Sequence, residues 1–233
     1  MRRTARAAVG GLVYHVLNRG NNRQSIFLKD GDYAAFLRLL IEGRRNAAVD
    51  VFGYCLMPNH WHLVVRPRGD RDLAAYLGWV SNTHVKRYRQ HYQDAGLGHL
   101  YQGRYKSFPV QDDGPLLRVL RYVEGNPLRA GLVDRAERWR WSSLGSSGRA
   151  EGAGVLSGWP VERPAPWVEI VNEPQAEAEV LALRAGVNRG RPYGTEQWVA
   201  GTARALGLEH TLRDAGRPRM QREPMQPERG KVN

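Results

Sequence analysis

Hydrophobic positions in residues 1–145 alternate between the short period of strands and the longer period of helices. Apolar, β-branched runs predict four strands, at residues 11–17, 49–57, 60–66 and 104–111. Amphipathic segments predict helices at residues 30–45, 72–92 and 114–125, and a further helical piece that begins at Pro127. The second and third strands flank Pro58-Asn59, a pair that is typical of a tight turn.

The order of these elements, β-α-β-β-α-β, is that of the ferredoxin-like split βαβ fold. We therefore expect residues 1–145 to form an α+β domain, with one antiparallel sheet and its helices on one face. Many unrelated activities occur on this fold, so it does not by itself predict a function.

The rest of the chain differs in composition from this first domain. Residues 1–145 carry 23 basic and 12 acidic side chains. Residues 146–183 carry 2 basic and 6 acidic side chains and are rich in Gly, Ser and Pro, which predicts an acidic, partly ordered connection. Residues 184–233 carry 10 basic and 5 acidic side chains, and we expect a small basic C-terminal tail module there.

The net charge of the 233-residue chain is +12, and 7 Trp and 10 Tyr accompany it. Basic charge combined with aromatic side chains is typical of nucleic-acid-binding proteins, particularly those that bind single strands. From charge alone, a merely basic protein or one that touches anionic membranes remains an alternative.

The sequence indicates neither a membrane or secretion signal nor a disulfide cross-link. No apolar run reaches the roughly 18 residues of a membrane span. Glycines and His15 interrupt the first apolar run, so we expect no signal peptide. The single cysteine, Cys55, excludes an internal disulfide framework and a cysteine-rich zinc site. We expect a cytoplasmic protein.

His60-Trp61-His62 lies in the third predicted strand. Alternate residues of a strand point to the same face, so both imidazoles project together and Trp61 turns to the other side. Two imidazoles at this spacing can bind one divalent ion. A chance His-x-His is the alternative in a chain with 7 histidines.

Tyr122 and Asn126 are four positions apart and share a helical face. If this face covers the His60 and His62 side of the sheet, the phenol and the amide oxygen reach the same metal site. A phenol with a pKa of about 10 is a poor nucleophile at neutral pH. A nearby cation can activate it or polarise the phosphate that it attacks. A structural, half-buried tyrosine is the alternative.

Cations and aromatic residues also alternate in residues 84–92 and 102–106. Such a mixture can hold phosphates while bases stack, although a solvated basic helix face has the same composition. We expect DNA contacts from six cations: Arg19, Lys86, Arg87, Arg89, Arg104 and Lys106.

Five motifs follow one another along the first domain: YHV at 14–16, NRGNNR at 18–23, GYCLMPNHWHL at 53–63, YQGRY at 101–105, and YVEGNP with AGLV between 122 and 133. In this order they resemble the REP-associated tyrosine transposases, domesticated relatives of single-strand insertion-sequence transposases among the HUH endonucleases. A fainter match is RGRP at 189–192.

The resemblance implies roles for the residues already singled out. It implies that His60, His62 and Asn126 hold a divalent cation, Mg²⁺ or Mn²⁺, and that Tyr122 is the nucleophile. Tyr122 would attack single-stranded DNA and leave a 5′-phosphotyrosine and a free 3′-hydroxyl, without ATP. The resemblance also implies hairpin-forming palindromic repeats near bacterial genes as the substrate, and we expect a monomer.

Two other functions fit parts of the sequence. A non-catalytic single-stranded nucleic-acid-binding protein would keep the fold, but it has no need of His60, His62, Tyr122 and Asn126 together. A metal-dependent hydrolase would use water as its nucleophile, with Tyr122 in a structural role. Formation of a covalent protein–DNA adduct distinguishes the transposase-like reaction from both.

Overall fold

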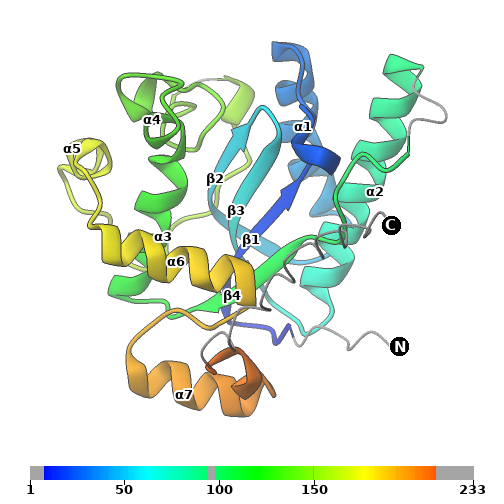
Figure 1. Ribbon diagram of the computed structural model, residues 1–233. Helices are drawn as coiled ribbons and strands as arrows, with labels where there is room; N and C mark the ends of the chain where they lie inside the picture. The colour runs from blue at the N-terminus through cyan, green and yellow to red at the C-terminus, as the bar shows by residue number, and fades with distance from the viewer. Residues whose placement is uncertain (1–7, 94–97, 149, 214–233) are drawn as a thin grey trace, which may run out of the picture.

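The structure is a computed structural model that describes residues 8–93, 98–148 and 150–213 (Figure 1). Four strands form one antiparallel sheet in the order β2-β3-β1-β4. The strands are β1 Val13–Arg19, β2 Val49–Met57, β3 His60–Pro67 and β4 Lys106–Val110. The α+β class and the ferredoxin-like element order are therefore confirmed.

Helices and short 3-10 turns connect and cover the sheet. The α-helices are α1 Asp30–Gly43, α2 Asp72–Tyr92, α3 Gly114–Glu124, α4 Asn126–Arg129, α5 Trp167–Asn172, α6 Glu177–Arg189 and α7 Glu196–Ala205. The 3-10 turns are η1 Asn21–Arg23, η2 Ala136–Arg138, η3 Ala150–Gly152 and η4 Glu209–Thr211. Among the described residues, no helix is both long and apolar enough to cross a membrane.

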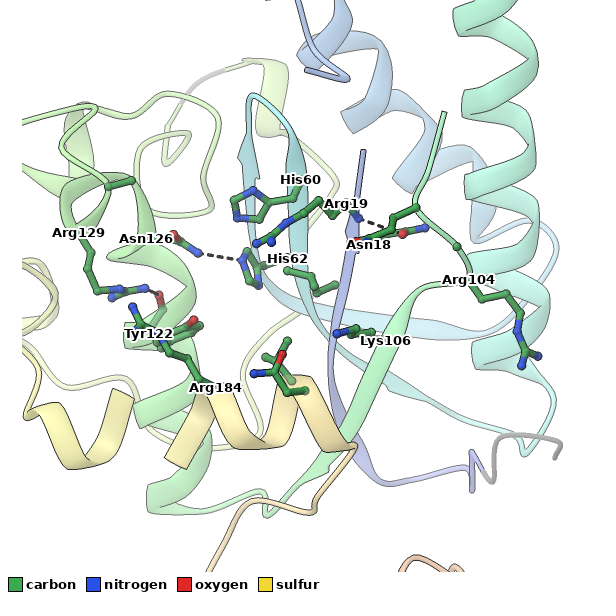
Figure 2. A pocket seen from close by; sticks show the side chains of 16 residues that line it. Asn18, Arg19, His60, His62, Arg104, Lys106, Tyr122, Asn126, Arg129 and Arg184 are labelled. Carbon is green, nitrogen blue, oxygen red and sulfur yellow. Dashed lines mark hydrogen bonds between the residues drawn. The ribbon is translucent and has the colours of Figure 1, made fainter. Parts of the chain in front are cut away.

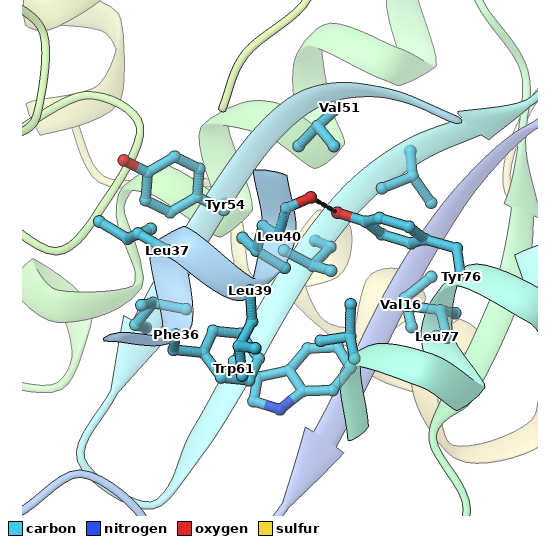
Figure 3. Packing of buried hydrophobic residues seen from close by; sticks show 14 of the residues in the cluster. Val16, Phe36, Leu37, Leu39, Leu40, Val51, Tyr54, Trp61, Tyr76 and Leu77 are labelled. Carbon is cyan, nitrogen blue, oxygen red and sulfur yellow. Dashed lines mark hydrogen bonds between the residues drawn. The ribbon is translucent and has the colours of Figure 1, made fainter. Parts of the chain in front are cut away.

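The first face of the sheet is covered by α1 and α2. Their apolar side chains form one core with Trp61, which is fully buried (Figure 3). In this core the Tyr76 hydroxyl donates to the Leu40 carbonyl at 2.8 Å and ties the two helices together. Burial of Trp61 also sets the orientation of β3. A slip of one residue would turn Trp61 toward the second face of the sheet and both neighbouring histidines into the core of the first face.

The second face is covered by α3 and α6, and α5 packs on the outer side of α3 (Figure 1). Phe52, Val64 and Phe108 belong to the apolar core on this face. The expectation that the helices lie on one face is therefore wrong. The physical reason is in the strands: β2 and β3 are apolar on both faces, and a sheet of this kind must be covered on both.

The acidic segment 146–183 covers the outer edge of β2 and is more than a connection. Ser157 N–H donates to the Val51 carbonyl at 2.7 Å, and the Trp159 indole donates to the Phe52 carbonyl at 2.7 Å. Such contacts protect an edge strand from pairing with other chains. The expected border between residues 183 and 184 falls inside α6, so among the described residues no tail module is separated at that point. Residues 214–233 of the expected tail lie outside the described part of the chain.

Candidate active site

The two histidines of β3 lie side by side on the second face of the sheet. The ring centroids of His60 and His62 are 5.0 Å apart, and Trp61 between them points into the core of the first face. This is the arrangement that the two-residue period of a strand predicts.

Tyr122 and Asn126 reach these histidines from the end of α3 and the start of α4 (Figure 2). The Asn126 amide nitrogen donates to His62 Nε2 at 2.8 Å. The Tyr122 ring stands edge-on to the His62 ring, with centroids 6.1 Å apart. The strongly amphipathic α3 buries one side against β2 and β3, and this packing brings Tyr122 over the histidines. Four residues that the sequence singled out thus form one cluster.

The imidazoles of the cluster are neutral at physiological pH. Burial, aided by the Arg19 charge, lowers the pKa of His60 to about 4. Burial and neighbouring positive groups hold the pKa of His62 well below its usual value. The His60 Nδ1–H donates to the Asn59 side-chain oxygen at 2.6 Å, which leaves Nε2 as the unprotonated nitrogen of that ring. Neutral imidazole is the form that binds metal ions.

The cluster lines a pocket of about 600 Å³ that is strongly positive. Five cations line it: Arg19, Arg104, Lys106, Arg129 and Arg184. No carboxylate is among the described residues that line it. A cavity with this charge suits a phosphodiester chain, because each phosphate finds a cation within reach and no like charge opposes it.

Two of these cations, Arg129 and Arg184, are not among the six DNA-binding residues named from the sequence, although phosphate contacts were expected from arginines of the tail. The Arg129 guanidinium lies 4.2 Å from the centroid of the Tyr122 ring and donates to the Tyr122 carbonyl at 2.7 Å. Its position seven residues after Tyr122, about two helical turns, was a signal that could have found it. Arg184 comes from α6, in the segment expected to be a separate tail, and no local pattern points to it.

The structure does not bring the cations of α2 to this pocket. Lys86, Arg87 and Arg89 are exposed on α2, on the opposite face of the sheet. Arg87 pairs with Glu42 at 2.8 Å, and Arg89 donates to the Gly98 carbonyl. Of the six expected DNA-binding cations, only Arg19, Arg104 and Lys106 line the pocket.

The donor set of the cluster fits a divalent cation such as Mn²⁺ or Mg²⁺. It consists of two neutral imidazoles, on His60 and His62, and the side-chain amide of Asn126. A half-turn of the Asn126 amide presents its oxygen in place of its nitrogen. The described residues hold no group of three His, Cys, Asp or Glu, so this mixed set is the candidate.

The family model described as "Transposase IS200 like" matches residues 8–126, more than half of the chain, and its range includes His60, His62, Tyr122 and Asn126. The chain belongs to the IS200-like transposase family.

Individual relatives agree with this assignment. A curated protein of Haemophilus influenzae, named as a REP-associated tyrosine transposase, is 26% identical over 108 residues. The match spans 42% of this chain and 60% of that protein. A solved structure of the REP-associated tyrosine transposase bound to a REP hairpin superimposes with a TM-score of 0.52. At 19% identity it covers 71% of this chain and 96% of the other, which supports the fold.

Proposed function

We propose that this member of the IS200-like transposase family is a metal-dependent single-stranded DNA endonuclease and strand transferase whose nucleophile is Tyr122. One observation carries the proposal. Tyr122 stands beside the Asn126–His62 pair and His60 in a pocket whose charged lining side chains are all cations. A non-catalytic binding protein needs the cations but not the cluster.

The proposed reaction is a transesterification. The Tyr122 oxygen forms a bond to the scissile phosphorus, and the bond from phosphorus to the 3′ oxygen breaks. The phenol loses its proton to solvent, and the departing 3′ oxygen gains one. The products are a 5′-phosphotyrosine and a free 3′-hydroxyl. Attack by a 3′-hydroxyl reverses the step, and no ATP is needed because one phosphoester replaces another.

The side chains of the pocket serve this reaction in different ways. Arg129 lies over the Tyr122 ring and holds a positive charge beside the nucleophile and the phosphate that it attacks. Arg19, Lys106 and Arg184 hold the DNA backbone. His60, His62 and Asn126 would hold the divalent cation, which, when bound, stabilises charge on the non-bridging phosphate oxygens.

We propose single-stranded DNA that folds into hairpins as the substrate. The support comes from the relatives: one is named as a REP-associated tyrosine transposase, and a protein of similar fold was solved bound to a REP hairpin. The positive pocket agrees with any single-stranded DNA, so the hairpin preference rests on these similarities. We propose that a monomer acts.

The test uses a hairpin oligonucleotide labelled at its 3′ end, incubated with the protein and Mn²⁺ or with EDTA. Because the 3′ fragment stays on Tyr122, the expected result is a labelled band that denaturing electrophoresis does not separate from the protein. EDTA and Tyr122→Phe should each abolish it. Tyr105→Phe, which alters a tyrosine next to Arg104 of the pocket, is the matched control and should keep it.

Other outcomes of this experiment identify the alternatives. Nicking by Tyr122→Phe at the original position would make water the nucleophile and the protein a hydrolase. If the unaltered protein binds the hairpin in Mn²⁺ but neither cuts it nor forms the adduct, the protein is a non-catalytic nucleic-acid-binding protein.

A further inference from the structure

A third histidine, His15, lies behind the active-site pair. It is 1% exposed, comes from β1 and is not among the residues that line the pocket. Its Nε2 is 2.9 Å from His62 Nδ1, and the two rings are stacked with centroids 5.1 Å apart. The register explains the contact: Leu17 is paired with His62, and His15 is the next residue of β1 on the same face.

The hydrogen bonds on either side of His62 determine where its proton lies. Asn126 presents an N–H to His62 Nε2, so this nitrogen accepts and carries no proton. A neutral imidazole then has its proton on Nδ1. The His62 Nδ1–H therefore donates to His15 Nε2, and His15 is the acceptor in this pair.

We propose that His15 is a positioning residue that holds His62 in the Nδ1–H tautomer and so keeps the Nε2 lone pair turned toward Asn126 and the pocket. The consequence for metal binding rests on the proposed function. With the opposite tautomer, a proton would occupy the nitrogen that must face the cation.

The neighbouring histidine has an equivalent support, which strengthens the assignment. His60 Nδ1–H donates to Asn59, so both rings of the pair have an acceptor behind them and an unprotonated Nε2. Asn59 is held in turn, because its amide donates to the Arg23 carbonyl at 3.1 Å. Acceptors of this kind fix the orientation of metal-binding histidines, and their loss typically weakens metal affinity about 10- to 100-fold.

The proposal is tested first on the DNA-free protein by ¹⁵N NMR of its histidine rings, which distinguishes a protonated Nδ1 from a protonated Nε2. We expect His62 to carry its proton on Nδ1 in the unaltered protein. Mn²⁺ affinity is then measured by calorimetry. His15→Leu removes the acceptor at similar volume, and we expect a loss of about 10- to 100-fold. His15→Gln, which can still present an oxygen, should restore most of the affinity.

Phe108→Leu is the matched control, since the Phe108 ring packs on His15 at a centroid distance of 4.9 Å but makes no hydrogen bond to it. It should lower thermal stability and leave Mn²⁺ affinity unchanged. If Phe108→Leu weakens Mn²⁺ binding as much as His15→Leu does, packing alone explains the effect and the proposal is overturned.

The NMR result separates this inference from the proposed function, and it also decides the matter should His15→Leu not fold. A proton on His62 Nε2 overturns the role of His15 whatever the metal affinity. A proton on Nδ1, with no Mn²⁺ bound by the unaltered protein, supports the role of His15 and contradicts the metal dependence of the proposed function. Unchanged Mn²⁺ affinity in a folded His15→Leu protein overturns the positioning role.

Discussion

Acid should destabilise this protein at a pH well above that at which ordinary carboxyl groups are protonated, because several histidines are buried as neutral rings. Burial lowers the pKa of His15 to about 3 and that of His84 to about 4. A histidine whose pKa is lower in the fold than in the unfolded chain binds its proton preferentially after unfolding. Its contribution to stability is therefore lost as pH falls from about 6.5 toward the pKa of the folded protein.

His84 allows this effect to be measured away from the active site. It lies on α2, in the core between the helices and the first face of the sheet. Tyr101 accepts the Trp61 indole N–H at 3.0 Å and donates its own proton to His84 Nδ1 at 2.6 Å. With a pKa of 6.5 in the unfolded chain and about 4 in the fold, His84 alone should lower the free energy of unfolding by about 2 kcal/mol at about pH 5.

The perturbation is His84→Gln, which keeps a possible acceptor for Tyr101 and does not titrate. The free energy of unfolding is measured by urea denaturation at about pH 7.5 and about pH 5, for both proteins. On acidification, the unaltered protein should lose about 2 kcal/mol more than the variant does. Comparing the two pH values cancels any packing cost of the substitution. Equal losses in the two proteins would refute the claim that His84 is buried as a neutral ring.

Three further predictions concern side chains around and beyond the pocket. Arg129→Gln should slow adduct formation in single-turnover assays about 10-fold, because it removes the positive charge that lies over the Tyr122 ring; an unchanged rate would show that Arg129 has no role in the reaction. If Lys86, Arg87 and Arg89 contact DNA, replacing all three with Ala should reduce the dependence of log affinity on log salt by about 0.7 per lost contact. The rate at which this variant cleaves DNA at saturating concentration should not change, since α2 lies across the sheet from the pocket. An unchanged salt dependence of binding would show that this face of α2 is solvated and does not contact DNA. Burial raises the pKa of Glu124, which accepts from Ser143 and Trp167, so its contribution to stability is lost as pH rises above the usual carboxyl range. The Glu124→Gln variant should therefore melt at a higher temperature than the unaltered protein at about pH 8 but not at about pH 4. The same difference in melting temperature at both pH values would contradict a raised pKa of Glu124.

The local period of apolar residues in the sequence predicts many of the strands and helices of this fold. Residues 49–57 and 72–92 form β2 and α2 with the bounds that their patterns predict, because the apolar period and the flanking turn residues are local signals. The strand period also placed His60 and His62 on one face. The spacing of Tyr122 and Asn126 predicts that both side chains point the same way, and the packing of α3 on this face of the sheet directs them to His62.

Only the tertiary structure decided which side chains from distant segments meet. His15 reaches His62 because β1 pairs with β3, and Arg184 enters the pocket because α6 packs on the second face of the sheet. It also decided that Lys86 stands on the opposite face from the cations of the pocket. These are consequences of strand order and of long-range packing of apolar surfaces. Patterns among residues that are near each other in the chain do not determine strand order or long-range packing.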